Sequence, residues 1–397
     1  MLLPIEKAKR LQNVKPSGMR ALFDLSQKTD HPNKFISFGL GDLNIPTPHP
    51  IVDKVKQALD KPETYRYSPN AGILELRMAL SEKYTSQYGL DYAAEGEIIV
   101  TCGCLEALFD IMMAYINPGD EVLVQDPSFG YFASQASLAN GKAVPVPLTS
   151  QFELDPEVFE EKITPKTKIS ILNFPCNPTG SCMGRSQLKE IVEIAADHKI
   201  LVVSDESYEK LVYEGFTHTC LAEISDENVI VAGSFSKTYS MTGFRVGYAI
   251  GPKELIAPVA QVHQYNTACA TTAAQVAALA ALQMDQKYVT QKIAILDQRR
   301  RDMMRHFSTV PGFKMNYKPQ GAFYIYPNIS ESGMSGKEFS QWAIKNTGVV
   351  VVPGTDFGVT TPNCLRMCYG TVEREEIQEA AERIHHALEK REAGKLQ

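Results

Sequence analysis

The 397-residue sequence lacks the long apolar runs, basic blocks and leader-like start that mark membrane, nucleic-acid-binding and secreted proteins. No apolar run approaches the roughly 18 residues that a membrane-spanning helix needs. The longest helical one, AAQVAALAALQM at residues 273–284, is predicted to be a buried or subunit-contacting helix. The start MLLPIEKAKR carries charges where a signal peptide needs its apolar centre, so we expect a cytoplasmic protein without a membrane segment.

The charge and the cysteine content limit which partners and which kinds of site are to be expected. Lys and Arg number 40 against 46 Asp and Glu, a net charge of −6, which argues against nucleic acid or an anionic membrane as the main partner. Eight cysteines in so long a chain do not suggest a disulfide framework. Because Cys102 and Cys104 have no second pair at metal-ligand spacing, we expect small core thiols and no metal site.

Short β-branched runs alternate with segments of helical spacing along the first two thirds of the chain. Residues 186–199 illustrate the helical spacing, because their apolar side chains fall on one face. The β-branched runs are EIIVTC, EVLVQDP, KAVPVPL, KISILNF, ILVVSDE, VIVAGSF and RVGYAIG. This alternation predicts an α/β fold with a mainly parallel sheet that helices cover on both faces.

Residues with chemical function follow these runs, where ligands bind in parallel sheets. After IIVTC, Gly103 opens a helix, so the free N–H groups of Cys104 and Leu105 form an anion site. The run EVLVQDP leads to an aromatic ring, Phe129. The runs KISILNF, ILVVSDE and VIVAGSF lead to polar groups: Asn177, then Asp205 with Tyr208, then Ser234 with Lys237. We expect all of them at one edge of the sheet.

These residues together suit one kind of ligand, a flat phosphorylated aldehyde with a ring nitrogen. They offer an anion site, an aromatic ring for stacking, a carboxylate, a phenol and a lysine. A cofactor with these properties is pyridoxal 5′-phosphate. A lysine forms an imine with the aldehyde, and a carboxylate keeps the ring nitrogen protonated so that the ring accepts electrons from a carbanion. The pattern alone leaves open a nucleotide-binding α/β enzyme as the main alternative.

Longer motifs give a family resemblance. SFSKTYSMTGFRVGY resembles the lysine motif of the class I/II aminotransferases, which are fold type I pyridoxal phosphate enzymes, and NFPCNPTG resembles their asparagine motif. Five further segments occur in the order that the family has them along the chain: GLGDLNIPTP, YSPNAGILELR, SDESY, GAFYIYP and LRMCYG. The resemblance covers roughly residues 36–370 and is greatest to archaeal and bacterial aromatic and aspartate aminotransferases.

The resemblance implies a fold and a division into domains. The fold is a mainly parallel seven-stranded sheet in a large domain, with a smaller α+β domain beside it. Residues 1–47 are then an N-terminal arm and part of the small domain, residues 48–285 the large cofactor-binding domain, and residues 286–397 the small C-terminal domain. A change in character after about Asp285, from alternating runs to a charged helix and short strands, agrees with the last boundary.

The resemblance also implies roles around the cofactor ring. Lys237 forms the Schiff base and, once substrate displaces it, moves the proton. Asp205 pairs with the ring nitrogen, Asn177 and Tyr208 hydrogen-bond the ring hydroxyl oxygen, and Phe129 stacks on the ring. From the residues alone, Asp205 and Asn177 fit as a helix cap and a turn cap, and Tyr208 and Phe129 as core residues.

Further roles concern the phosphate and the substrate. Gly103, the amides of Cys104 and Leu105, Ser234 and Arg245 hold the phosphate, whereas Ser236 is equally well a turn residue. Tyr67 reaches the phosphate in the neighbouring subunit, so a homodimer with shared active sites is implied; a local core tyrosine is the competing interpretation. Arg366 binds the substrate α-carboxylate, with Asn177 nearby and Gly41 allowing close backbone approach. A surface salt bridge is the plainer role for Arg366.

The substrate loop and the helix start depart from the family's patterns. Relatives often have Gly-Glu-Pro-Asp-Phe where this chain has GDLNI, and some have a lysine after the helix glycine where this chain has CLE. No second arginine for a distal carboxylate is identifiable. These departures put a preference for aspartate in doubt.

We therefore expect an aminotransferase that moves the amino group of an aromatic amino acid or aspartate to a 2-oxo acid, with 2-oxoglutarate as the expected acceptor, by a ping-pong mechanism. Three alternatives stay open: a strict aspartate aminotransferase, a lyase on the same fold (a C–S β-lyase or a cyclopropane-forming synthase), and a non-enzymatic regulator.

Overall fold

The protein is described by a computed structural model that covers residues 5–14, 18–29 and 31–394. Its centre is a seven-stranded sheet in which only β8 runs against its neighbours. The strands, in their order across the sheet, are β2 (Ile98–Thr101), β8 (Gly247–Ile250), β7 (Val229–Ser234), β6 (Leu201–Asp205), β5 (Thr167–Leu172), β3 (Glu121–Asp126) and β4 (Lys142–Pro147). All seven predicted runs form strands of this sheet, and the predicted α/β fold is confirmed.

Both faces of the sheet are apolar, because successive side chains of a strand point to opposite faces and each face is covered by helices. In β6, for example, Val202 joins one core and Val203 the other. One face packs against α2 (His49–Leu59), α3 (Leu74–Tyr88), α6 (Pro156–Glu161), α7 (Arg185–Asp197) and α9 (Thr272–Gln283). The other packs against α4 (Cys104–Tyr115), α5 (Tyr131–Leu138) and α8 (Lys253–Asn266).

A second set of cores surrounds two small sheets. Strands β11 (Val352–Pro353), β12 (Leu365–Cys368) and β9 (Tyr324–Ile325) form an antiparallel sheet, and β1 (Ile36–Ser37) pairs in parallel with β10 (Val349–Val350). Around them lie α1 (Gly18–Lys28), α11 (Gly336–Thr347) and α12 (Arg374–Glu392). Helix α11 begins at a capping box between Ser335 and Glu338 and ends before Gly348, whose φ of 68° suits glycine.

Short 3₁₀ turns complete the architecture at η1 (Lys9–Asn13), η2 (Pro62–Tyr65), η3 (Leu221–Glu223), η4 (Thr242–Phe244), η5 (Ser330–Ser332) and η6 (Gly354–Asp356). No helix among the described residues is long and apolar enough to cross a membrane. The apolar stretch at residues 273–284 forms α9, whose alanine-rich face is buried against the sheet side, as predicted.

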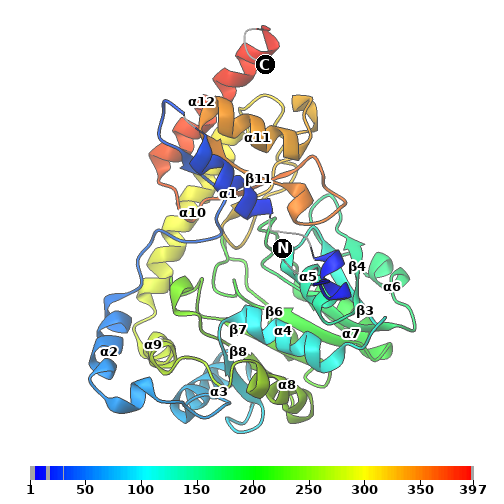
Figure 1. Ribbon diagram of the computed structural model, residues 1–397, viewed down its shortest axis with the longest axis vertical. Coiled ribbons are helices and arrows are strands. Elements are labelled where there is room, and N and C mark those ends of the chain that lie inside the picture. Colours follow the sequence, from blue (N-terminus) through cyan, green and yellow to red (C-terminus); the bar gives the residue numbers. More distant parts are fainter. Residues whose placement is uncertain (1–4, 15–17, 30, 395–397) are drawn as a thin grey trace.

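Helix α10 (Lys287–Phe307) connects the two parts of the molecule. Its first turn contributes Val289 to the core beside the large sheet, and its later turns contribute Leu296 and Met303 to the core beside the small sheets. Ile293 packs against both. Figure 1 shows this helix, in yellow, running from the level of α9 to the level of α12. The domain boundaries at residues 47 and 285 stay a prediction.

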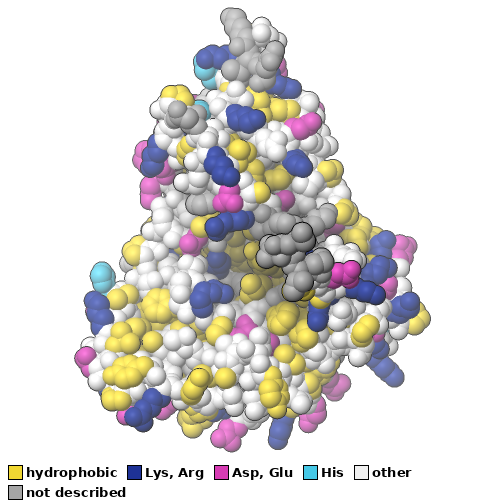
Figure 2. Space-filling view, in the orientation of Figure 1, with side chains coloured by type: hydrophobic (Ala, Val, Ile, Leu, Met, Phe, Trp, Pro, Cys, Tyr) yellow, Lys and Arg dark blue, Asp and Glu magenta, His cyan; other side chains and the backbone are white. Residues whose placement is uncertain are grey.

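The topology places the predicted site residues, which follow the strands, at one edge of the large sheet. The parallel strands all end there, and because β8 runs in the opposite direction, its start brings Arg245 to the same edge. Figure 2 shows that this face of the molecule is hollowed between its upper and lower parts, with hydrophobic side chains on the floor of the hollow.

Candidate active site

Lys237 lies in the turn after β7 and points toward the loop that contains Gly41. Its Nζ donates a hydrogen bond to the carbonyl oxygen of Gly41 at 2.6 Å and lies 5.8 Å from the centre of the Phe323 ring. Burial lowers the pKa of Lys237, although the carboxylate of Asp42 opposes this shift. The side chain is therefore easier to deprotonate than a lysine in water, as a nucleophilic amine requires.

Asp205 ends β6 as a buried carboxyl group and contacts the first residue of α4. Its Oδ1 accepts hydrogen bonds from the Ser207 amide at 3.0 Å and from the Cys104 thiol at 3.6 Å. Burial raises the pKa of Asp205. A cationic ring nitrogen beside it would restore the charged form. Cys104 is a core thiol, as predicted, but its contact with Asp205 is not evident from the sequence.

Tyr208 and Tyr324 meet at their hydroxyl groups, 2.7 Å apart. Both side chains are buried, and burial raises the pKa of each. Tyr324 also lies against Gly41, where an added Cβ would come within 2.6 Å of the tyrosine oxygen. The prediction missed Tyr324, although the motif GAFYIYP contains it. The lack of a side chain at Gly41 thus allows close packing against Tyr324, while close approach of its backbone to the substrate stays a prediction.

Arg366 is only 1% exposed and lies between two aromatic rings, with its guanidinium carbon 5.0 Å from the centre of Tyr324 and 4.7 Å from that of Phe357. Its Nη1 donates to Asn177 Oδ1 at 3.3 Å and its Nη2 to Gly39 O at 2.5 Å. Among the residues that the structure describes, none accepts a hydrogen bond from its Nε. A buried N–H group without a partner is costly, so this arrangement favours an anionic ligand.

The segment that opens α4 packs closely against Arg245. Gly103 has a φ of 85°, and a Cβ there would lie 2.6 Å from Nη2 of Arg245. The exposed guanidinium also donates to the carbonyl oxygens of Thr242 and Cys102. Ser234 is buried nearby, and its hydroxyl accepts a hydrogen bond from the Ser236 amide, which makes Ser236 a turn residue. Helix start, arginine and serine together form a suitable anion cradle.

The remaining predicted residues lie at the margin. Phe129 is half-buried before α5, with its ring centre 4.6 Å from that of Tyr131. The carbonyl oxygen of Leu105 accepts a hydrogen bond from Gln135, which fixes the first turn of α4. Tyr67 is 90% exposed, so its side chain lies in solvent and is not a local core residue.

Pyridoxal phosphate fits this set of residues. The missing Cβ of Gly103 leaves space beside a cationic side chain for a phosphate, and the buried carboxyl of Asp205 faces the helix that carries this cradle. Lys237 supplies an amine whose pKa burial has lowered. The contacts from Lys237 through Gly41, Tyr324 and Arg366 to Asn177 form one continuous network.

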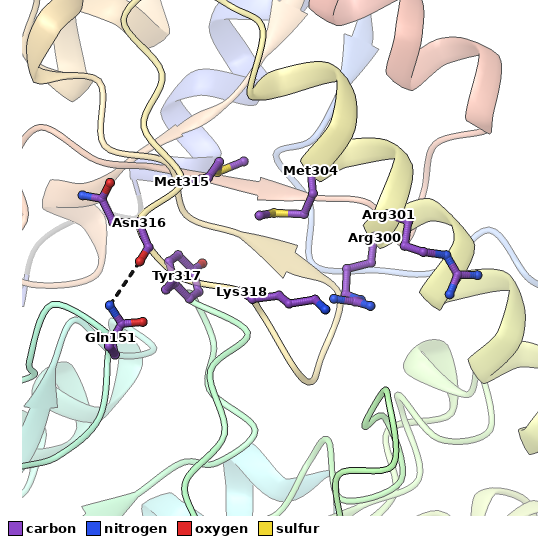
Figure 3. A pocket seen from close by; sticks show the side chains of 8 residues that line it. All are labelled: Gln151, Arg300, Arg301, Met304, Met315, Asn316, Tyr317 and Lys318. Carbon is purple, nitrogen blue, oxygen red and sulfur yellow. Dashed lines mark hydrogen bonds between the residues drawn. The ribbon is translucent and has the colours of Figure 1, made fainter.

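A separate hollow of about 480 Å³ lies between α10 and the segment that follows it (Figure 3). Gln151 closes one side by donating to the carbonyl oxygen of Asn316. The cations at the hollow are already paired, Arg300 and Arg301 with Asp297 and Lys318 with Glu214. None of the predicted site residues lines it, and we assign the chemistry to the sheet edge instead.

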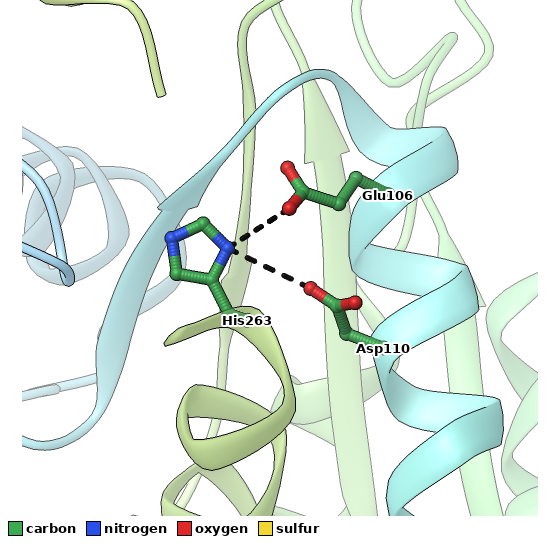
Figure 4. Close-up of side chains that lie close together, drawn as sticks. All are labelled: Glu106, Asp110 and His263. Atoms are coloured by element: carbon green, nitrogen blue, oxygen red, sulfur yellow. Dashed lines mark hydrogen bonds and ion pairs between the residues drawn. The ribbon is translucent and has the colours of Figure 1, made fainter. Parts of the chain in front are cut away.

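Glu106, Asp110 and His263 form a buried cluster beneath the cradle (Figure 4). His263 Nδ1 lies 3.0 Å from Glu106 and 3.6 Å from Asp110, and Nε2 lies 2.9 Å from the carbonyl oxygen of Asn70. Burial opposes protonation of His263, but hydrogen bonds to Asp110 and Glu106 outweigh it and raise its pKa to about 10. A cationic imidazole donates from both nitrogens and has no lone pair for a metal.

Three of the four carboxylate oxygens of this cluster also accept hydrogen bonds, whereas Oδ2 of Asp110 has only its ion pair with His263. Glu106 accepts hydrogen bonds from the Cys102 amide and the Thr267 hydroxyl, and Asp110 accepts one from Asn266. The cluster therefore joins the loop before Gly103 to α8, and we interpret it as a structural ion cluster.

Comparison with known proteins gives one consistent result. The family model described as aminotransferase class I and II matches residues 33–384. The aspartate aminotransferase of Pyrococcus horikoshii is 37% identical over 386 residues, which are 96% of this chain and 97% of that protein. Aromatic-amino-acid aminotransferase 2 of Thermococcus litoralis is 36% identical, with 96% and 98% covered. The solved structure of Thermus thermophilus aspartate aminotransferase with maleate has a TM-score of 0.89 and 32% identity, with 96% and 99% covered.

Proposed function

The chain belongs to the class I and II aminotransferase family, and from this we propose that it transfers the amino group of aromatic amino acids and of aspartate to 2-oxoglutarate. The family implies pyridoxal phosphate as cofactor, and relatives named for aspartate and for aromatic substrates are about equally similar to this chain. The observation that carries the proposal is the contact network between Lys237 and Arg366, which puts an amine of lowered pKa and a buried anion site in one place.

When bound, pyridoxal phosphate supplies the electron-accepting ring that lets an amino group leave one acid and enter another. The protein's residues then have separate tasks. Arg366 holds the substrate α-carboxylate through its unpartnered Nε and its outer nitrogens, which makes the α-carbon face Lys237. Lys237 would take the proton from that carbon and pass it to the cofactor in one half of the ping-pong cycle, and would carry a proton from the cofactor to the α-carbon of the second acid in the other half.

Asp205, Asn177 and Tyr208 orient the ring. Asp205 is buried, so its carboxylate stabilises a protonated ring nitrogen without competition from water. Tyr208 is held by Tyr324, and Asn177 is held by Asn173 and Arg366. Gly103, the amides of Cys104 and Leu105, Ser234 and Arg245 hold the phosphate, and Phe129 covers one face of the ring.

The breadth of substrates follows from the charges near Lys237. The arginines that act on its amine are Arg366 and Arg245, which we assign to the α-carboxylate and the phosphate. Among the described residues of α10, Arg299 and Arg300 are the buried arginines, and they form ion pairs with Glu373 and Glu214. Neutral donors would therefore hold the distal carboxylate of aspartate or 2-oxoglutarate, and the same space would admit an aromatic ring.

A strict aspartate aminotransferase is the second candidate, because relatives with that name are frequent among those most similar to the chain. A panel of amino donors with 2-oxoglutarate separates the two. We expect kcat/KM for phenylalanine or tyrosine within an order of magnitude of that for aspartate, about 1.4 kcal/mol. Preference for aspartate above about a thousandfold, ~4 kcal/mol, would mean a dedicated distal cation. Release of ammonia with no amino acid formed from the acceptor would instead indicate a lyase.

We also propose that the enzyme is a cytoplasmic homodimer whose two subunits share their active sites. Tyr67 supports this, because its side chain is exposed, as are those of Tyr65 and Leu74, which are close to it in the sequence. A surface of this kind is typical of a subunit interface. Sedimentation of the purified protein at several concentrations tests the dimer.

A further inference from the structure

Lys292 is a fully buried lysine in α10, with a side chain that is 1% exposed. Its Nζ donates a hydrogen bond to the carbonyl oxygen of Lys237 at 2.6 Å and a second, shorter one to that of Thr238. It lies in a helix with many charged residues, so its sequence pattern does not distinguish it from a solvated lysine.

The contact differs from that of Lys83, another lysine with a buried side chain. Lys83 forms an ion pair with Glu209 at 2.5 Å, which compensates the cost of burying its charge. Among the described residues no carboxylate forms an ion pair with Lys292, and its partners are two backbone carbonyls and the ring of Tyr288, 5.9 Å away. Burying an amine without a carboxylate partner costs free energy, so the place of Lys292 in the core needs a specific reason.

The geometry of the turn supplies that reason. The Met241 amide donates to Ser236, five residues earlier, so the turn does not continue as a helix. The carbonyl oxygens of Lys237 and Thr238 therefore face α10 without helical partners, and each would remain unsatisfied in the core if Lys292 were absent. At the other end of the turn, the Thr47 hydroxyl donates to the carbonyl oxygen of Ser240.

We propose that Lys292 is a positioning residue for Lys237, which fixes the turn that carries this amine to the helix that spans both hydrophobic cores. The proposal rests on the proposed function, since it assigns Lys292 a part in the same reaction. Ile293, next in sequence, packs against both cores, so Lys292 projects from the point where α10 passes between them. Movement of the small sheets relative to the large one would thus act directly on the backbone of Lys237.

The charge of Lys292 adds a second effect on the same amine. Burial, and then the positive charge of Lys237, lower the pKa of Lys292 to about 7. Either form keeps the contacts, because a neutral amine still has two N–H donors for two carbonyls, while the charge is present only below about pH 7. The other charged or titratable groups that act on Lys237 are Asp42, Cys368, Arg366 and Arg245, none of them in α10.

The test variant is Lys292→Met, which keeps the length of the side chain and removes its N–H donors and its charge. The matched control is Lys287→Met, because Lys287 is an exposed lysine of the same helix. The readouts are the pH midpoint of the absorbance of bound pyridoxal phosphate without substrate, the steady-state constants, and thermal unfolding of the cofactor-free protein. We expect Lys292→Met to raise the midpoint by on the order of 0.5 pH unit, because a nearby positive charge is lost. We also expect kcat to fall about tenfold or more with KM within threefold, because Arg366 is untouched.

The control is expected to match wild type in the midpoint and in kcat. A Lys292→Met protein that is only less heat-stable, with wild-type midpoint and kcat, would overturn the proposal, as would a change confined to KM. If Lys292→Met does not fold, Lys292→Gln carries the test: its shorter side chain has no charge and cannot reach both carbonyls, so a wild-type midpoint and kcat in that variant also overturn it. Failure of the wild-type protein to bind pyridoxal phosphate would instead refute the proposed function.

Discussion

The hydroxyl groups of Tyr208 and Tyr324 lie 2.7 Å apart and join the large sheet to the antiparallel small sheet. Tyr208 follows β6, while Tyr324 begins β9, 116 positions later in the chain. The hydroxyl of Tyr324 also borders Gly41, whose carbonyl oxygen binds Lys237. A single phenol therefore contacts both the group assigned to the cofactor hydroxyl and the loop that receives the lysine.

Replacing Tyr324 with phenylalanine removes the partner of Tyr208 while the aromatic ring beside Arg366 remains. We expect kcat/KM to fall about fivefold to tenfold, on the order of 1 kcal/mol, because one buried hydrogen bond is lost. Steady-state kinetics with one amino donor measures this. Tyr326→Phe is the matched control, since Tyr326 is equally buried and bonds to Thr361 instead. Equal kinetic effects in the two variants would contradict a role of Tyr324 at the site.

The strands and the strand-end residues could be predicted because they depend on local pattern. Each run of β-branched residues is long enough to form one strand of the sheet. In a parallel sheet the carboxyl ends of the strands lie at the same edge, whatever the order of the strands. Asp205, for instance, follows directly on a buried strand, and its place at the sheet edge follows from that alone.

Three features of the site could not be predicted in the same way. They are the role of Tyr324, the contact of the Cys104 thiol with Asp205, and the contact of Lys292 with the backbone of Lys237. Tyr324 lies in a strand of only two residues, whose position is set by packing of the small cores. Cys104 contacts Asp205 only because α4 packs on the face of the sheet that contains β6. Lys292 contacts the backbone of Lys237 only because α10 packs against the turn after β7. Such contacts follow from tertiary approach, which no residue spacing in the sequence encodes.

Arg366→Lys should weaken all amino acid substrates alike. A lysine cannot reproduce the planar donor set or fill the space between the rings of Tyr324 and Phe357. We expect kcat/KM to fall by about a hundredfold for aspartate and for phenylalanine, roughly 3 kcal/mol, mainly through KM. Arg300→Lys is the control, because Arg300 is as buried but binds Glu214 and Asp297. It should lower stability and leave KM unchanged. A loss restricted to aspartate would assign Arg366 to the distal carboxylate instead.

His263→Gln should change stability in a pH-dependent way. The pKa of His263 is raised in the folded chain to about 10, compared with roughly 6.5 when unfolded. Its contribution to stability is therefore fully present below about pH 6.5 and is lost as the pH rises through about 10. We expect the difference in melting temperature between wild type and His263→Gln to be largest near pH 6 and to shrink steadily toward pH 10. Added chelator should leave the wild-type value unchanged. A difference that is constant with pH would mean that the imidazole is neutral, and the cluster would again be a candidate metal site.

Tyr67 provides the sharpest test of shared active sites, because its side chain is 90% exposed in the single chain. Hybrid dimers of wild-type chains with Tyr67→Phe, Lys237→Ala chains contain one site with an intact lysine, and the tyrosine of that site comes from the mutant chain. Hybrids with Lys237→Ala chains are the control, since there the same site keeps Tyr67. We expect pyridoxal phosphate to bind about tenfold more weakly at the intact-lysine site of the first hybrid, as loss of one hydrogen bond to a charged phosphate implies. Equal affinity in the two hybrids would show that Tyr67 acts within its own subunit or not at all, because only the first hybrid removes the hydroxyl that would cross the interface.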